Sequence, residues 1–425
     1  MNIIAIIGLG YVGLPLALQF ARSGTRVLGL DIDERKTDAL NAGQSYIAHV
    51  SAASVMEQRK AGLLEASTDF SRIREADSVI LCVPTPLNVY REPDLSYVLE
   101  TGRALAPHLR KGALVVLEST TYPGTTDTEL RKVLEQGSGM TAGVDFHLAF
   151  SPEREDPGNP DSKVAIIPKV VGGLTPLCLE KAMTLYGRAI TSLVPVASCR
   201  VAEATKLLEN IFRSVNIALV NELKMVYSAM DINIWDVIEA AKTKPFGFMP
   251  FYPGPGLGGH CIPIDPFYLT WKAREFGQHT RFIELAGEIN TLMPDYVVKV
   301  ASEALNQEGK PVKGSRILIL GLAYKANVDD DRESPTYKLI EKFETLGAVV
   351  TYHDPHVPVI PMTREHAVYA GRKSVAAITE DHELIILSTG HDAYKTFDFS
   401  GFQIPLVDTR NAVPPGHRPA KYHRA

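Results

Sequence analysis

The sequence predicts an α/β protein with two α/β domains that are joined by a long central helix and a helical dimerisation domain. Two segments, one at the N-terminus and one after residue 313, begin with an apolar run that leads through a glycine-containing turn into a helical pattern. Between them, Cys199 to Asp231 contains no glycine and no proline, which predicts a helix about 45 Å long. We therefore expect three parts, at residues 1–198, 199–300 and 313–425.

The N-terminal segment carries a glycine motif in the context that such a motif requires. A predicted strand, Asn2 to Ile7, precedes it, and a predicted helix, Leu14 to Ala21, follows it. The motif reads Gly8-Leu9-Gly10-Tyr11-Val12-Gly13. In a G-x-G-x-x-G turn the first glycine permits the tight turn, the second lets the backbone approach a pyrophosphate, and the third lets the helix pack on the strand. The segment therefore predicts a Rossmann domain whose turn, Tyr11 and Val12 included, binds a dinucleotide.

The next predicted strand indicates which dinucleotide is bound. It runs from Arg26 to Leu30 and ends at Asp31, at about the 20-residue spacing that is typical of these domains. An acidic residue at this place accepts hydrogen bonds from the adenosine ribose and repels a 2′-phosphate. The sequence therefore predicts NAD, not NADP, as the cofactor.

Polar residues follow three further predicted strands of the same domain. The strands are Ser78–Pro84, Ala113–Glu118 and His147–Phe150, and the residues that follow them are Thr85, Thr120 and Glu153. An open α/β sheet binds its ligands at the carboxyl ends of its strands. We expect these three side chains at the ligand-binding edge.

The segment after residue 313 repeats the same logic in a degenerate form. A predicted strand, Arg316 to Leu320, leads into Gly321-Leu322-Ala323-Tyr324-Lys325-Ala326, where alanine occupies two of the three glycine positions. Val349–His353 and Leu384–Leu387 are its next predicted strands. We interpret it as a second Rossmann-like domain that has lost dinucleotide binding. The tail from Pro414 is rich in Pro, His and Arg, and we expect it to be poorly ordered.

Composition excludes several classes of protein. The net charge of −5 and the lack of a basic run exclude nucleic acid as a partner. No apolar stretch approaches the ~20 residues that span a bilayer, and a strand beginning at residue 2 leaves no room for a signal peptide. The four cysteines have neither metal nor disulfide spacing, so we expect no metal site and a reducing cytoplasm. Cys82 lies in an apolar run and is predicted to be in the core.

The most informative segment is a glycine-rich loop that ends on a cysteine. It reads Gly254-Pro255-Gly256-Leu257-Gly258-Gly259-His260-Cys261-Ile262-Pro263-Ile264-Asp265-Pro266. Four glycines in six residues let a backbone approach a phosphate or a sugar without obstruction by side chains. Cys261 is a candidate covalent nucleophile at the end of this loop, and the alternative is a buried cysteine beside a structural turn.

On the predicted long helix, Lys206 and Asn210 are spaced i, i+4 and project from one face. They are typical of a solvated polar edge. Beside a nicotinamide, they could instead bind an alkoxide and fix a water molecule. The spacing alone leaves both interpretations open.

These motifs, in this order, resemble the UDP-glucose/GDP-mannose dehydrogenase family of nucleotide-sugar 6-dehydrogenases over nearly the whole chain. The resemblance implies a four-electron, NAD-dependent oxidation of C6 of a UDP-sugar, by a homodimer or a higher homo-oligomer. The loop from Phe248 to Cys261 looks most like the branch that acts on UDP-N-acetylglucosamine. His260 and Ile264 stand where UDP-glucose enzymes typically have Ser and Lys. UDP-N-acetylgalactosamine, UDP-N-acetylmannosamine and UDP-glucose stay open as substrates, as does a non-catalytic nucleotide-sugar-binding protein.

The resemblance also implies residue roles. Cys261 would hold the aldehyde as a thiohemiacetal and then as a thioester, and Lys206 would stabilise the oxyanions. Asp265 would act as a base or orient Lys206 and the water, and Asn210 would position that water. Glu153 and Thr120 match the family's other catalytic residues. The residues that match its substrate contacts are Tyr252, Gly258, Lys325 and Arg410. Those that match its cofactor contacts are Thr85, Thr120, Arg332 and Lys36, and Arg35 fits the position of Lys36 equally well. Where UDP-glucose enzymes often offer an arginine, Pro245 stands beside Lys244, so contacts from a partner subunit are left open.

Overall fold

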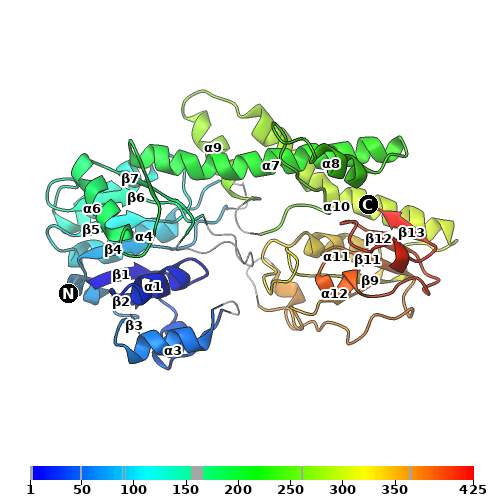
Figure 1. Ribbon diagram of the computed structural model, residues 1–425, viewed down its shortest axis with the longest axis horizontal. Coiled ribbons are helices and arrows are strands. Elements are labelled where there is room, and N and C mark those ends of the chain that lie inside the picture. Colours follow the sequence, from blue (N-terminus) through cyan, green and yellow to red (C-terminus); the bar gives the residue numbers. More distant parts are fainter. Residues whose placement is uncertain are drawn as a thin grey trace. The chain divides into compact units, whose positions relative to one another are not determined.

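The protein folds into two compact units in a computed structural model that describes residues 3–47, 50–88, 90, 92–154, 166–259, 262–362 and 366–425. The first unit comprises Met1–Glu209 and Phe267–His279, and the second comprises Asn210–Pro266 and Thr280–Ala425. Each unit is built around its own sheet (Figure 1). The chain passes between the units three times: inside α7 (Cys199–Ala229), inside α9 (Asp265–Arg274) and between His279 and Thr280.

The first unit contains an eight-stranded sheet in the order β3-β2-β1-β4-β5-β6-β7-β8 (Figure 1). All neighbouring strands are parallel except β6 and β7. The strands are β1 (Ile3–Ile7), β2 (Arg26–Leu30), β3 (Leu64–Ser67), β4 (Ser78–Leu81), β5 (Leu114–Leu117), β6 (His147–Phe150), β7 (Lys169–Gly173) and β8 (Leu193–Val196). Its first six strands have the 3-2-1-4-5-6 order of a dinucleotide-binding fold.

Helices cover both faces of this sheet because its central strands are apolar on both sides. In β1, Ile4 and Ile6 belong to one core and Ala5 and Ile7 to the other, as the two-residue period of a strand requires. The helical segments are α1 (Gly13–Arg22), α2 (Glu34–Asn41), α3 (Ala52–Lys60), η1 (Phe70–Glu75), α4 (Ser96–Leu105), η2 (Ala106–His108), η3 (Thr125–Leu130), α5 (Arg131–Ser138) and α6 (Pro176–Tyr186). Cys82 is half-buried and packs against the first core, as predicted.

The second unit contains a five-stranded parallel sheet in the order β10-β9-β11-β12-β13 (Figure 1, orange and red). The strands are β9 (Arg316–Leu320), β10 (Val349–His353), β11 (Leu384–Leu387), β12 (Leu406–Asp408) and β13 (Tyr422–Arg424). Its helical segments are the C-terminal part of α7, α8 (Ile234–Ala241), α10 (Arg281–Gln307), α11 (Pro335–Thr345), η4 (Ala367–Tyr369), α12 (Asp392–Lys395) and η5 (Pro415–His417). The predicted α/β class with two Rossmann-like domains is confirmed.

The prediction of a poorly ordered tail after Pro414 is wrong. Its last residues form β13, which pairs in parallel with β12. The hydroxyl of Tyr422 donates to Asp408 Oδ2 at 2.9 Å, and the Arg418 guanidinium lies 4.3 Å from the centre of the Tyr422 ring. The strand is held by main-chain pairing and by a cation–π contact, neither of which needs an apolar run in the sequence.

The same brace holds the turn after the first strand in both sheets. In the first unit, Leu9 N donates to the carboxylate of Asp31 at 2.9 Å. In the second unit, Leu322 N donates to the carboxylate of Asp354 at 2.6 Å. Each acid follows the second strand in its unit, so the two turns are fixed by equivalent groups. The second sheet thus keeps the brace of the first although it lacks two of the three glycines.

Candidate active site

The turn after β1 has the space that a dinucleotide needs. Gly8 adopts a φ of +89°, and a Cβ there would lie 2.5 Å from the carbonyl oxygen of Cys82. A Cβ at Gly13 would lie 1.9 Å from the carbonyl oxygen of Gly8. At Gly10, in contrast, a Cβ would meet no atom within 4 Å. The chain itself crowds the first and third glycines and leaves open the side of the second, where a pyrophosphate approaches. The residues therefore fit the cofactor.

Asp31 lies at the end of β2 and is 6% exposed. Besides Leu9 N, its carboxylate accepts hydrogen bonds from Asp33 N at 3.0 Å and from Lys36 Nζ at 3.1 Å. Arg35 is instead exposed and pairs with Asp33. Of the two cations that the sequence placed equally well, Lys36 is the one that reaches Asp31.

One neighbour of Asp31 was missed from the sequence. Ile32 follows it directly and is 84% exposed. We expect Ile32 to offer an apolar contact to an adenine ring, since it stands beside the acid that is predicted to bind the ribose. The sequence feature that could have identified Ile32 is its position between Asp31 and Asp33, directly after a predicted strand.

The residues that follow β4, β5 and β6 gather at one edge of the sheet, because these three strands are adjacent and parallel. Thr85 is buried, and its carbonyl oxygen accepts a hydrogen bond from the hydroxyl of Tyr268 at 2.8 Å. Thr120 and Glu153 are half-buried at the same edge. Tyr268 on α9 was not identified from the sequence, since it contacts a residue 183 positions away.

Lys206 is buried on α7, and its ammonium donates to the carbonyl oxygen of Glu153 at 2.6 Å. The Glu153 carboxylate lies 3.7 Å from Lys169 Nζ, which also donates to the buried carboxylate of Glu118 at 3.0 Å. Burial raises the pKa of Glu118, and the lysine ammonium opposes this effect. These contacts fix the Glu153 loop from two sides. Neither Glu118 nor Lys169 was predicted, because nothing in the sequence links residues 51 positions apart.

One helical turn after Lys206, Asn210 lies beside Asp265. The amide nitrogen of Asn210 donates to Asp265 Oδ2 at 2.5 Å, and both side chains are 3% exposed. Asp265 is also the first residue of α9. Since Lys206 is only 8% exposed, the pair on α7 is not a solvated polar edge.

The glycine-rich loop is held within the second unit. Gly254 N donates to Asn221 Oδ1 at 3.0 Å, and the amide of Asn221 donates to Asn290 Oδ1 at 2.9 Å. A Cβ at Gly258 would lie 2.7 Å from Cβ of Tyr324. Cys261 and His260 lie outside the described residues. The sequence did not single out Asn221, although an asparagine on an apolar helix face was a visible signal.

The other predicted substrate and cofactor contacts also lie in the second unit. Arg410 is packed against Gly254, whose Cβ would lie 2.3 Å from Nη1, and Arg410 Nε donates to Ser388 O at 3.1 Å. Burial lowers the pKa of Arg410 to about 10, against the effect of Asp408. Arg332 donates twice to Asp330, at 2.9 and 2.6 Å.

Two further predicted contacts are more accessible. Lys325 is half-buried in the turn after β9. Tyr252 is 43% exposed, and its hydroxyl donates to Glu239 at 2.8 Å.

The described part of the chain contains no group of three His, Cys, Asp or Glu side chains that could hold a metal ion. Among its helices, none is both long enough and apolar enough to cross a membrane. What the fold does present is a dinucleotide turn, a buried ammonium and a buried amide–carboxylate pair. These features define an oxidoreductase that uses a dinucleotide.

Comparison with known proteins identifies the family. The chain matches three domains of the UDP-glucose/GDP-mannose dehydrogenase family: the NAD binding domain at residues 1–190, the central domain at 200–292 and the UDP binding domain at 318–415. It is 35% identical over 404 residues to the UDP-N-acetyl-D-glucosamine 6-dehydrogenase of Salmonella typhi, which covers 94% of this chain and 93% of that one. It is 38% identical over 407 residues to the UDP-N-acetyl-D-mannosamine dehydrogenase of Escherichia coli strain K12, with 93% and 95% covered.

Comparison with a solved structure supports the same family. The UDP-D-ManNAc dehydrogenase of Pyrococcus horikoshii has a TM-score of 0.90 at 31% identity, over 99% of this chain and 98% of that one. The chain belongs to the UDP-glucose/GDP-mannose dehydrogenase family. It is an NAD-dependent nucleotide-sugar dehydrogenase.

Proposed function

We propose that the protein oxidises C6 of a UDP-N-acetylhexosamine, with UDP-N-acetylglucosamine as the favoured substrate, to the corresponding uronate. One observation carries the proposal. The buried ammonium of Lys206 lies one helical turn from Asn210, which is hydrogen-bonded to the carboxylate four positions after Cys261. The name of the Salmonella relative and the sequence of the loop before Cys261 support this choice of sugar. Other relatives are named for N-acetylmannosamine and N-acetylgalactosaminuronic acid, which are the alternatives.

The cofactor would be held by the Gly8–Gly13 turn and Asp31, with Lys36, Thr85, Thr120 and Arg332 as further contacts. Two NAD molecules, bound one after the other, would each accept one hydride. The first oxidation removes a proton and a hydride from the primary alcohol and leaves an aldehyde. Lys206 stabilises the negative oxygen during this step, because an ammonium in a buried site is effective against developing charge.

The thiolate of Cys261 then adds to the aldehyde and forms a thiohemiacetal. Loss of a proton and of a second hydride converts it into a thioester. Water held by Asn210 and Asp265 attacks the acyl carbon, the C–S bond breaks, and the carboxylate and the thiol are released. Glu153 and Thr120 contact the sugar and this water. The substrate would also be bound by Tyr252, Gly258, Lys325 and Arg410.

Steady-state kinetics test the substrate. The values of kcat/KM are compared for UDP-N-acetylglucosamine, UDP-N-acetylgalactosamine, UDP-N-acetylmannosamine and UDP-glucose, with NADH counted per sugar. We expect two NADH per sugar and the highest value for UDP-N-acetylglucosamine. A clear preference for UDP-glucose would contradict the proposed sugar, and the absence of NADH with all four would favour a binding protein without catalysis.

The Cys261→Ser variant tests the covalent steps. Serine can add to the aldehyde, but the oxygen ester that follows is a poorer acyl donor than a thioester. We expect turnover to stop, with sugar retained on the protein as an increase in mass. Full turnover by the variant would refute the covalent role of Cys261.

We also propose that the chain forms a homodimer through α7. Phe212, Leu219, Val226 and Met230 are each more than 40% exposed on this helix. Their spacings of seven, seven and four residues place them on one face. Such an apolar stripe on a surface is typical of an interface between protein chains.

A further inference from the structure

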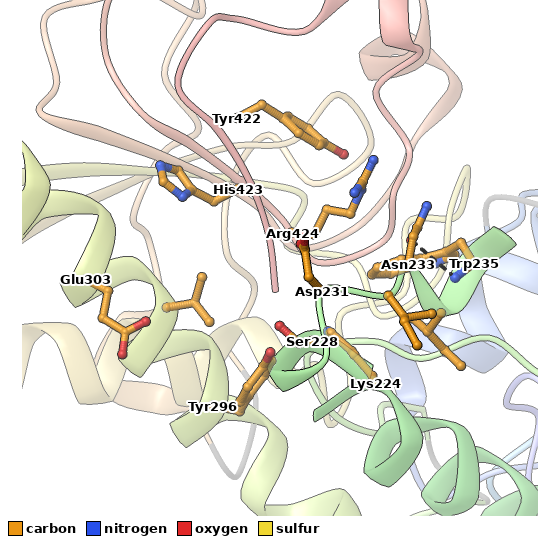
Figure 2. Close-up of a pocket in the computed structure, with 13 residues that line it drawn as sticks. Lys224, Ser228, Asp231, Asn233, Trp235, Tyr296, Glu303, Tyr422, His423 and Arg424 are labelled. Carbon is orange, nitrogen blue, oxygen red and sulfur yellow. Dashed lines mark hydrogen bonds between the residues drawn. The ribbon is translucent and has the colours of Figure 1, made fainter. Parts of the chain in front are cut away.

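A cavity lies in the second unit, and none of the residues to which the proposed chemistry assigns a role lines it. It has a volume of about 550 Å³, within the range that is typical of small-molecule sites. It is lined by side chains from α7, α8, α10 and β13, among them Lys224, Trp235, Tyr296, Glu303, His423 and Arg424 (Figure 2). We call it the Lys224 pocket.

Lys224 is an anomaly among the charged residues of α7. It is 2% exposed, and its ammonium has no hydrogen-bond partner among the described residues. Its Nζ lies 5.5 Å from the centre of the Trp235 ring and 5.4 Å from that of Tyr296. These rings offer cation–π attraction but accept none of the three N–H donors in a normal hydrogen bond. A buried ammonium without an anion is costly, so the site favours an incoming negative charge.

The other residues that line the pocket indicate which chemical groups a ligand of Lys224 would carry. Apolar side chains from Ile232, Ile234 and Val300 can cover a ring or an aliphatic body. Arg424 adds a second cation, and Asp231 and Glu303 add acceptors for hydroxyl or ammonium groups. A molecule with one anionic end, an apolar body and some hydrogen-bond donors matches this distribution.

We propose that the Lys224 pocket binds a small organic anion, whose carboxylate or phosphate oxygens accept hydrogen bonds from the ammonium of Lys224. The pocket shares no lining residue with the proposed dehydrogenase site. The inference is therefore independent of the substrate that the dehydrogenase uses.

The protonation state of Lys224 gives the site a pH dependence. Burial lowers the pKa of Lys224 to about 7, the charge of Arg410 acts in the same direction, and Asp408 opposes it. The titratable groups that line the pocket around Lys224 are Asp231, Tyr296, Glu303, Tyr422, His423 and Arg424. Burial also lowers the pKa of His423, so this imidazole is neutral above pH 7. Anion binding requires the protonated lysine and should weaken as the pH rises above 7.

Calorimetric titration of the full chain tests the proposal. The probes are benzoate, with a carboxylate, and phenyl phosphate, with a phosphate, in saturating UDP so that the nucleotide site is filled. We expect a dissociation constant on the order of 1 mM at neutral pH for the better probe. Tighter binding of benzoate would indicate a carboxylate ligand, and tighter binding of phenyl phosphate would indicate a phosphate ligand. Lys224→Met, which keeps the side-chain length, should weaken binding at least tenfold, and Lys310→Met, at an exposed position in the same unit, should leave it unchanged.

The pH series supplies the sharper criterion. Benzoate keeps its charge above pH 5, so its affinity should fall about tenfold per pH unit above pH 7 in the wild type and stay level in Lys224→Met. Equal binding by the wild type and Lys224→Met would overturn the proposal, as would the absence of binding by both probes. If Lys224→Met does not fold, the wild type still decides. NMR of ¹⁵N-lysine should show the pKa of Lys224 rising on saturation with the probe, and an unchanged pKa would overturn the proposal.

Discussion

The carboxylate of Asp31 braces the turn before it, and we propose that it also accepts hydrogen bonds from the ribose of the cofactor. Replacing it with asparagine keeps the size and one acceptor oxygen but removes the charge that repels a 2′-phosphate. We expect Asp31→Asn to lower the ratio of kcat/KM for NAD to that for NADP by about tenfold, which corresponds to about 1.4 kcal/mol. Asp33→Asn is the matched control, since Asp33 is two positions away and pairs with exposed Arg35. An unchanged ratio in Asp31→Asn would show that Asp31 does not select the cofactor.

The buried pair of Glu118 and Lys169 is a second feature that acts at the level of single residues. Lys169→Met leaves the carboxylate of Glu118 buried without its cation, which should reduce the free energy of unfolding by about 3–5 kcal/mol. Removing both charges, in Glu118→Gln with Lys169→Met, should restore most of this loss.

The chain has two tryptophans, Trp235 and Trp271, and only Trp271 lies in the first unit. Urea unfolding in a Trp235→Phe background therefore reports the stability of the first unit through the fluorescence of Trp271. The predicted coupling between Glu118 and Lys169 would be contradicted if Lys169→Met lowered the free energy of unfolding by less than 1 kcal/mol. It would also be contradicted if the double variant were less stable than Lys169→Met.

At the scale of elements, Asp354 joins the turn after β9 to the end of β10 and to the buried ring of His391, 3.1 Å away. Burial would raise the pKa of Asp354, but His391 and the main-chain N–H groups of Ala323 and His356 lower it to about 2 from 3.8. Between these values the unfolded chain binds more protons than the folded one. The stabilisation is therefore present above pH 3.8 and lost as the pH falls through about 2.

We expect this loss to reach about 2 kcal/mol in the second unit, and to be missing in Asp354→Asn. Urea unfolding at a series of acidic pH values, followed by Trp235 fluorescence in a Trp271→Phe background, measures it. The slope of the unfolding free energy with pH should be steeper in the wild type than in Asp354→Asn. Equal slopes would mean that Asp354 is not the group that titrates.

At the scale of the molecule, the exposed apolar stripe on α7 makes a prediction about assembly. Leu219→Asp places a charge in the middle of the stripe, which should shift a dimer to monomers by the desolvation cost of a buried charge. Sedimentation velocity over a range of concentrations measures the shift. Lys310→Glu, at an exposed position outside α7, should leave the assembly unchanged. A Leu219→Asp protein that sediments as the wild type does would remove the stripe from the interface.

The sequence predicted most of the fold because the strands of both sheets are local signals. The runs Arg26–Leu30, Arg316–Leu320 and Leu384–Leu387 are apolar and bounded by turns, and they occur as strands with the same bounds in the structure. β13 was missed because its three residues are polar and acquire their role only beside β12. Strands with a local sequence pattern could thus be predicted, whereas a strand that depends on pairing with a distant segment could not.

The same distinction applies to the site. The glycine turn and Asp31 could be predicted, because each follows a recognisable strand. The contacts of Tyr268 with Thr85 and of Lys169 with Glu118 join residues far apart in the chain, and no periodicity reports them. The spacing of Lys206 and Asn210 also did not predict whether they are exposed to solvent, because their burial depends on the segments that cover α7.

The brace that recurs in both sheets has a consequence for hydrogen exchange. The amide hydrogens of Leu9 and Leu322 are each bound to a buried carboxylate. Exchange at Leu9 therefore reports the opening of the cofactor turn, and binding of NAD should slow it. Exchange at Leu322 reports an equivalent turn that we interpret as binding no dinucleotide, and it should not respond. The two amides give one measurement with its control inside the same molecule.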